Sequence, residues 1–296
     1  MTATAVPADE GSITLSGARR LAYASWGDRA DTPVLLFHGM PGSRSLCPDV
    51  EATRDRAVRL IAVDRPGYGR STPRPGRVVA DWADDVRVLL DGLGISSVSV
   101  IGWSSGGAYA LACAALLGAR VRSAALVAAD APLDDLPAAR AELPEEVIDL
   151  IERVRADPRG DARAAVVARC EWYASDPGSI LRNADARASA ADDPDMILRR
   201  RPDVRPALDA MFAEGARQGS AGYVDDWIAT VLPWGFRVSE VSCPVAVWWG
   251  DRDQLTDRMH AEYLAAAIPG ARLRVIPGEG HSLPMRHWSS ILDDLR

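Results

Sequence analysis

The hexapeptide Gly102-Trp103-Ser104-Ser105-Gly106-Gly107 is the most informative motif of the sequence, because it lies between an apolar run that ends at Ile101 and an apolar helical segment, residues 108–117. A serine in such a strand-to-helix turn has unusual backbone angles, and the flanking glycines let neighbouring backbone pass without Cβ clashes. Its hydroxyl is thereby directed over the carboxyl ends of the strands, where open α/β sheets bind ligands. We therefore predict that Ser104 is a nucleophile, and that Ser105 presents a free backbone N–H beside it at the helix N-terminus.

Short apolar runs on both sides of this turn predict a sheet. Strands that are buried on both faces are expected at residues 34–37, 60–63 and 98–101, and further strands at residues 124–128, 245–249 and 273–276. Residues 78–93 carry apolar side chains at helical spacing between two of these runs, and residues 13–15 and 21–26 predict an N-terminal hairpin. This alternation predicts an α/β fold with a doubly wound, mostly parallel sheet.

The alternation stops in the middle of the chain. Residues 132–238 contain charge-rich helical segments and Asp-Pro breaks, with no convincing strand pattern. We therefore predict a loose N-terminal tail over residues 1–11, an α/β core over residues 12–131 and 239–296, and a helical cap over residues 132–238.

A second motif, His38-Gly39-Met40-Pro41-Gly42, directly follows the first buried strand. A turn so rich in glycine and proline fixes the backbone N–H of Met40 toward the strand ends. Together with the Ser105 N–H, this donor predicts an oxyanion hole, which acyl transfer requires. His38 itself is interpreted as a hydrogen-bonded structural histidine rather than as a general base.

The third motif contains the predicted general base. Gly278-Glu279-Gly280-His281-Ser282 follows the last predicted strand, so His281 is expected to lie in a loop above the sheet. Of the other histidines, His260 falls within a predicted helix, residues 257–267, and His287 in or beside the final helix. Both are interpreted as surface or packing residues, which leaves His281 as the predicted base.

Three aspartates compete for the role of the acid that holds this histidine. Asp251 and Asp253 follow the strand at residues 245–249, and Asp130 follows the strand at residues 124–128. A buried carboxylate at either place can accept a hydrogen bond from His281 Nδ1–H and fix its tautomer. The residues alone leave this choice open.

Composition removes other chemistries. All 34 basic residues are arginine, so a Schiff base and a Ser–Lys dyad are both excluded, and serine chemistry depends on histidine. The formal net charge of −7 argues against nucleic acid or an anionic membrane as the main partner, and no run reaches the ~18 apolar residues of a membrane span. The partner that we expect is a small-molecule substrate.

Other features of the sequence bear on cofactors, localisation and oligomeric state. Four scattered cysteines have no metal-ligand spacing, so we expect no metal and no organic cofactor. The start of the chain has no basic or apolar region of a signal peptide, which predicts a cytoplasmic protein. No pattern in the sequence indicates the oligomeric state.

The order Ser104, Asp253, His281, with an H-G-x-P loop upstream, resembles the α/β-hydrolase fold superfamily. Residues 64–71, Asp-Arg-Pro-Gly-Tyr-Gly-Arg-Ser, are similar to the D-x-P-G-x-G-x-S loop of its cap-bearing esterase and proline-iminopeptidase-like branches. The resemblance covers about residues 12–130 and 240–296. It implies a cap between the sixth and seventh strands, and it selects Asp253, three residues after the glycine that ends its strand, as the acid.

The resemblance also implies a reaction class. Relatives with an aspartate nucleophile open epoxides or remove halogens, whereas Ser104 points to a carboxylesterase-like serine hydrolase. Such an enzyme cleaves an ester-type bond, a carboxylic ester or a lactone, of a small, partly apolar molecule through a Ser-His-Asp triad and an acyl-enzyme. An aminopeptidase, a thioesterase and a C–C bond hydrolase share the triad and stay open, as does a ligand receptor or non-hydrolytic catalyst of the same fold.

Three aromatic residues are candidates for contact with substrate. Trp103 precedes the nucleophile, and Trp234 and Phe236 stand near the return from the cap to the core. The alternative is that such aromatics pack the cap helices on the core.

Overall fold

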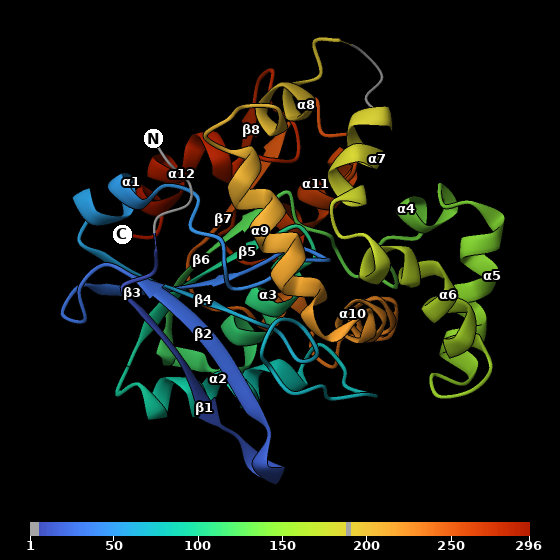
Figure 1. Cartoon of the computed structure of the whole chain (residues 1–296), viewed down its shortest axis with the longest axis horizontal. Coiled ribbons are helices and arrows are strands. Elements are labelled where there is room, and N and C mark those ends of the chain that lie inside the picture. Colours follow the sequence, from blue (N-terminus) through green and yellow to red (C-terminus); the bar gives the residue numbers. More distant parts are fainter. Residues whose placement is uncertain (1–5, 188–190) are drawn as a thin grey trace.

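The computed structural model describes residues 6–187 and 191–296. Within them an eight-stranded sheet has the order β1-β2-β4-β3-β5-β6-β7-β8 (Figure 1). Its strands are β1 (Asp9–Thr14), β2 (Arg20–Trp26), β3 (Thr32–Phe37), β4 (Val58–Val63), β5 (Val98–Trp103), β6 (Val121–Val127), β7 (Val245–Gly250) and β8 (Arg272–Ile276). β2 pairs antiparallel with β1 and β4, and the pairs from β4 through β8 are parallel.

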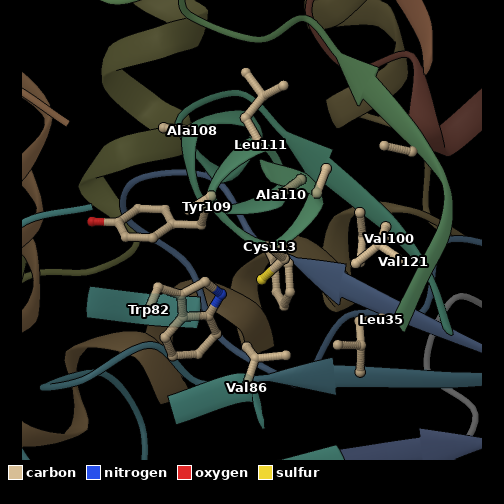
Figure 2. Close-up of a cluster of buried hydrophobic side chains, with 14 of the residues drawn as sticks. Leu35, Trp82, Val86, Val100, Ala108, Tyr109, Ala110, Leu111, Cys113 and Val121 are labelled. Carbon is tan, nitrogen blue, oxygen red and sulfur yellow. The ribbon is translucent and has the colours of Figure 1, made fainter. Parts of the chain in front are cut away.

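Helices cover both faces of this sheet. The core helices are α1 (Val50–Asp55), α2 (Asp81–Gly92), α3 (Gly106–Leu116), α11 (Arg258–Ala267) and α12 (Pro284–Asp293). On one face, Trp82 and Val86 of α2 pack with α3 and with Leu35 of β3 (Figure 2). On the other face, Trp288 of α12 packs with the strand residue Leu36. The predicted doubly wound α/β fold is therefore confirmed.

The N-terminal prediction needs a correction. β1 begins at Asp9, so residues 9–11 of the predicted loose tail are part of the sheet. Glu10 lies opposite Ala24 of β2, and the ladder uses backbone groups whatever the side chains are. β1 alternates exposed with half-buried residues and lacks an apolar run, which is why its start left little signal. Residues 1–5 of the same prediction lie outside the described residues.

Between β6 and β7 the described chain forms helices and no strand. They are α4 (Pro137–Ala141), α5 (Glu145–Ala156), α6 (Ala162–Ser175), α7 (Ser179–Arg187), α8 (Pro194–Arg199), α9 (Arg205–Gly215) and α10 (Ala221–Val231). Figure 1 shows α4, α5 and α6 grouped at one side of the molecule. α10 lies between them and the core, because Ile228 joins the apolar cluster of α5 and α6 while Ala229 joins that of the sheet.

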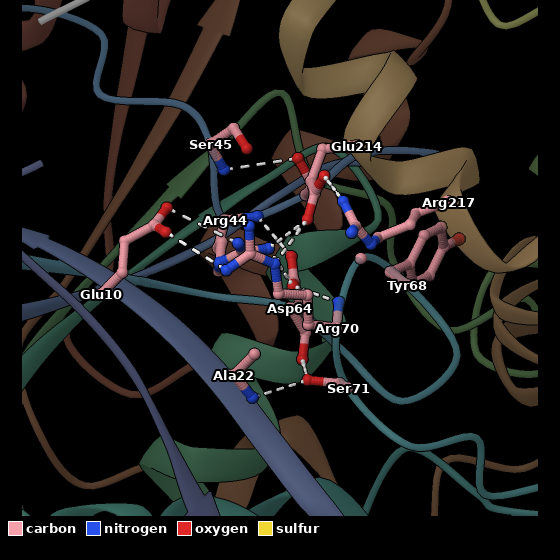
Figure 3. A network of polar contacts seen from close by, with 12 residues as sticks. Glu10, Ala22, Arg44, Ser45, Asp64, Tyr68, Arg70, Ser71, Glu214 and Arg217 are labelled. Atoms are coloured by element: carbon pink, nitrogen blue, oxygen red, sulfur yellow. Dashed lines mark hydrogen bonds and ion pairs between the residues drawn. The ribbon is translucent and has the colours of Figure 1, made fainter. Parts of the chain in front are cut away.

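The loop at residues 64–71 ties this helical segment to the core (Figure 3). The buried Asp64 carboxylate accepts hydrogen bonds from the backbone N–H of Arg44 (2.7 Å) and of Arg70 (2.9 Å). The guanidinium of Arg44 bonds both Asp64 and Glu214 of α9, each at 2.7 Å. Ser71 closes the loop by donating to the Asp64 carbonyl (2.7 Å).

No helix in the described part of the chain is long and apolar enough to span a membrane.

Candidate active site

Ser104 lies in the turn between β5 and α3 with a left-handed backbone, φ 55°. A non-glycine residue pays strain energy in this conformation, and such residues concentrate at functional sites. The turn is tight because a Cβ on Gly106 would overlap the Phe37 carbonyl oxygen, and one on Gly102 would overlap the Gly106 carbonyl oxygen. The flanking glycines therefore allow the approach that holds Ser104 at the sheet edge.

Ser104 and His281 line the same cavity, which has a volume of about 290 Å³. The core contributes the loop Gly39 to Pro41 and Trp103 to its wall. The rest of the lining comes from Asp130, Leu255 and Thr256 and from Ile180, Met211 and Phe212 of the helical segment between β6 and β7, which we call the cap. A reacting serine here would face a mostly apolar chamber that the core and the cap enclose together.

His281 is paired with Asp253. Its Nδ1 lies 2.9 Å and 3.2 Å from the two carboxylate oxygens of Asp253, whose side chain is fully buried. Asp253 Oδ1 also accepts hydrogen bonds from the backbone N–H of Leu255 (2.8 Å) and Thr256 (3.0 Å). Because Nδ1 is engaged, the Nε2 atom of His281 is the ring nitrogen left for a reacting group.

Charge shapes the titration of this pair. Burial opposes the charged form of His281, but the charge and hydrogen bond of Asp253, together with the charges of Asp195 and Asp130, raise the pKa of His281 to about 9. Burial favours the neutral acid of Asp253, yet His281 and the two backbone donors outweigh it and hold the pKa of Asp253 below its ordinary value. The site thus favours an imidazolium next to a carboxylate, the charge pair that forms when a serine is deprotonated.

The two rival aspartates have other places. Asp251 is exposed, and its carboxylate accepts a hydrogen bond from Gly278 N–H (2.7 Å), which closes the turn before the His281 loop. Asp130 lines the cavity and acts on His281 through its charge. Of the three, Asp253 is the one hydrogen-bonded to the imidazole.

The loop after β3 lies against the serine. A Cβ on Gly39 would be 3.3 Å from Ser104 Cβ and 3.9 Å from Ser104 Oγ, so the glycine backbone approaches the hydroxyl closely. Among the described residues, the N–H groups of Met40 and Ser105 donate no backbone hydrogen bond. Both donors of the predicted oxyanion hole are therefore unengaged.

The orientation of the Met40 donor follows from its peptide group. The Gly39 carbonyl accepts hydrogen bonds from His38 Nδ1–H (2.7 Å) and from the guanidinium of Arg65 (3.0 Å). In a trans peptide the C=O and the next N–H point in opposite directions, so anchoring the Gly39 oxygen directs the Met40 N–H the other way. His38 and Arg65 thus orient one donor, a role for which no sequence motif singled out Arg65.

His38 is a structural histidine. Its ring is buried, Nε2 accepts from the backbone N–H of Arg65 (3.3 Å), and Nδ1–H is committed to Gly39. Burial and the nearby Arg65 charge hold the pKa of His38 well below its usual range, so the ring stays neutral. It does not belong to the cavity wall.

The His281 loop is held by a residue that sequence reasoning missed. Asp195 of α8 accepts hydrogen bonds from the backbone N–H of His281 and of Ser282, both at 2.7 Å. Trp103 Nε1–H donates to the His281 carbonyl (3.0 Å). The Asp-Pro-Asp sequence at residues 193–195 marks a helix start, but nothing local indicates that its second carboxylate reaches a loop 86 residues away.

The other predicted residues divide between cavity and packing. Trp103 lines the cavity, and Trp234 lines a neighbouring one. Phe236 lies in neither wall; it packs against Trp234, with ring centroids 6.0 Å apart, and against the core. His260 is in α11 and His287 in α12, and neither reaches the first cavity. Among the described residues, no group of three or more His, Cys, Asp or Glu is arranged to hold a metal ion.

Comparison with known proteins gives the family of the chain. The chain is 33% identical over 296 residues to a non-heme chloroperoxidase of Streptomyces lividans, covering 96% of this chain and 98% of that one. It is 25% identical over 295 residues to a bifunctional esterase/perhydrolase of Acinetobacter calcoaceticus, with the same coverage. The solved structure of an esterase from Exiguobacterium antarcticum matches with a TM-score of 0.68 at 20% identity, over 97% of this chain and 98% of that one.

The match to a family model is equally extensive. The model of the alpha/beta hydrolase fold matches residues 32–287, a range that starts at β3 and ends within α12 and so includes Ser104, Asp253 and His281. We conclude that the chain belongs to the alpha/beta hydrolase fold family.

Proposed function

We propose that this protein is a serine hydrolase that cleaves a carboxylic ester or lactone of a small, partly apolar molecule. The observation that carries the proposal is the position of Ser104 and His281 in one cavity, with Asp253 bound to the far side of the imidazole. The esterase and esterase/perhydrolase among the similar proteins support the same reaction class.

The mechanism follows from the residues around that cavity. Ser104 Oγ attacks the carbonyl carbon while His281 Nε2 accepts the hydroxyl proton, and Asp253 stabilises the imidazolium that forms. The negative charge moves to the carbonyl oxygen, where the N–H groups of Met40 and Ser105 receive it. His281 then gives its proton to the leaving alcohol, and an acyl-enzyme on Ser104 remains.

Hydrolysis is completed by water. His281 takes a proton from a water molecule, the hydroxide attacks the acyl carbon, and the proton returns to Ser104 as the carboxylic acid leaves. The substrate is a small molecule because the cavity measures about 290 Å³ and is lined mostly by apolar side chains.

All four cysteines are free and buried, which supports a reducing compartment such as the cytoplasm.

The test is covalent labelling followed by turnover. A fluorophosphonate probe should label the wild type, p-nitrophenyl acetate and butyrate should be hydrolysed, and Ser104→Ala should lose both activities while keeping its circular dichroism spectrum. Ser97→Ala, a change at a serine whose hydroxyl only meets Arg122 on the surface, is the matched control. Labelling without turnover of any ester would instead support a receptor or a non-hydrolytic catalyst.

The same triad serves other acyl substrates, so the panel includes them. Amino acid p-nitroanilides test an aminopeptidase, acyl thioesters a thioesterase and a β-diketone a C–C bond hydrolase. A kcat/KM on one of these that exceeds the best ester value would move the proposal to that class.

A further inference from the structure

A second cavity of about 210 Å³ lies beneath the cap beside the first, and Asp130 and Leu255 line both. Most of its wall is apolar and comes from α5, α10 and the segments that flank them. The residues are Leu143, Val147, Ile151, Trp227, Val231 and Trp234. The mechanism above uses none of them.

The end of this cavity nearest the nucleophile is polar. Ser105 is 2% exposed, its Oγ has no hydrogen-bond partner among the described residues, and it lines this cavity. Asp130 is partly buried, and no described side chain or backbone group donates a hydrogen bond to its carboxylate. Buried polar groups without partners cost stability, and native structures retain few of them unless a ligand or water completes them.

A third polar group faces the same space. His260 lines the second cavity, and its Nδ1 accepts the backbone N–H of Ala131 (3.0 Å). The proton of the neutral ring is therefore on Nε2. The polar end thus offers a carboxylate acceptor at Asp130, an unpartnered hydroxyl at Ser105 and a ring donor at His260.

We propose that the second cavity binds one arm of the substrate, and that this arm carries a hydroxyl close to the scissile carbonyl, followed by an apolar chain. The hydroxyl is placed near the carbonyl because Ser105 directly follows Ser104 and Asp130 borders both cavities. It donates to Asp130 and accepts from Ser105 or His260. A hydroxyl fits better than an ammonium group, because burial raises the pKa of Asp130 and so weakens the charge that would hold an ammonium group, whereas a hydroxyl can bond the carboxyl group in either form.

This inference rests on the proposed ester hydrolysis and names its substrate class. The test uses matched ester pairs: p-nitrophenyl 3-hydroxyoctanoate with p-nitrophenyl octanoate, and 2-hydroxyoctyl acetate with octyl acetate. We expect the wild type to prefer the hydroxylated member of at least one pair by about 10-fold or more in kcat/KM. Asp130→Leu should bring that ratio close to one.

The test uses the ratio of kcat/KM between the two members of a pair, because any change that Asp130→Leu makes to His281 affects both members and cancels in the ratio. Ratios near one for both pairs in the wild type, or a ratio that Asp130→Leu leaves unchanged, overturn the inference. A stronger preference for the 3-amino analogue overturns the choice of a hydroxyl.

A cavity-filling change tests the apolar part. Val147→Phe should lower the ratio of octanoate to acetate turnover by about 10-fold or more, because the added ring occupies the space of the chain. Val88→Phe, on the exposed side of α2, is the matched control and should leave that ratio unchanged. Equal ratios in the two variants would contradict the proposed binding of a substrate arm in this cavity. If the wild type shows no ester turnover that depends on Ser104, the proposed function itself is contradicted.

Discussion

Arg65 and Asp226 form an ion pair in which both side chains are fully buried, with nitrogen and oxygen 2.6 Å apart. Asp226 belongs to the cap helix α10, while Arg65 follows β4 and donates to the Gly39 carbonyl. Arg77 and the hydroxyl of Tyr109 also bond the Asp226 carboxylate, at 2.6 Å and 2.7 Å. One cap carboxylate is therefore connected, through one guanidinium, to the peptide that presents the Met40 N–H.

We expect Asp226→Asn to lower both stability and kcat. Removing one member of a buried ion pair leaves an uncompensated charge and costs about 3–5 kcal/mol. Arg65 then holds the Gly39 carbonyl less firmly, so the Met40 N–H is less well placed for the oxyanion while substrate still binds. Urea unfolding and steady-state kinetics should show a fall in kcat with little change in KM.

Tyr109→Phe is the matched control for this prediction. It removes one hydrogen bond to the same carboxylate, which costs about 1 kcal/mol, but it leaves Arg65 and Gly39 connected. Its kcat should equal that of the wild type. If Tyr109→Phe and Asp226→Asn lower kcat equally, the pair does not orient the oxyanion donor; should Asp226→Asn fail to fold, Arg65→Lys, which keeps the charge, provides the same kinetic comparison.

On acidification, activity should fall at a higher pH than it would if the base had the ordinary pKa of a histidine. In the proposed mechanism only neutral His281 accepts the Ser104 proton. Because Asp253 raises the pKa of His281 to about 9, kcat/KM should fall about tenfold per pH unit below that pKa. The pH profile of p-nitrophenyl butyrate hydrolysis measures the midpoint. A midpoint at or below the reference value of ~6.5 would contradict the raised pKa.

Asp253→Asn should change that profile as well as the rate. Without the carboxylate, burial dominates and the midpoint moves to lower pH, while kcat falls by up to ~10⁴. Asp251→Asn is the control, because its exposed carboxylate bonds only a turn N–H and should leave both quantities unchanged. A large effect of Asp251→Asn with a small one of Asp253→Asn would reverse the assignment of the acid.

The features that the sequence predicts are those with local causes. The central strands contain short apolar runs, such as residues 34–37 and 60–63, and the turn at Ser104 needs glycines on either side, so both leave a pattern within a few residues. The preference for Asp253 over Asp251 came instead from the resemblance to a family. The structure gives a physical reason, since Asp253 is buried against the imidazole and Asp251 is exposed.

The features that the sequence does not predict depend on distant partners. Arg65 and Asp226 are 161 residues apart, and the residues around each one do not indicate its partner. Trp234 and Phe236 are two residues apart and both pack on the core, but Trp234 also lines a cavity. Only the packing of the cap decides between them.

Asp195 is expected to act as a positioning residue for the base. Asp195→Ala removes the acceptor of two backbone N–H groups at His281 and Ser282, so the loop is less fixed and kcat should fall by about 10²-fold. Because the Asp195 charge also raises the pKa of His281, the midpoint of the pH profile should move down. Asp192→Asn, at an exposed ion pair with Arg252, is the control. A lower kcat with an unmoved midpoint would indicate a merely structural role.

The left-handed backbone conformation of Ser104 predicts an effect on stability rather than on rate. A non-glycine residue at φ 55° costs about 1–2 kcal/mol, and glycine avoids that strain. Ser104→Ala keeps the Cβ atom and the strain, whereas Ser104→Gly removes both, at the expense of a more flexible unfolded chain. We expect both variants to be inactive and Ser104→Gly to be the more stable by about 1 kcal/mol in urea unfolding. If Ser104→Ala is equally or more stable, the turn stores no strain at the nucleophile, and the glycines around it serve packing alone.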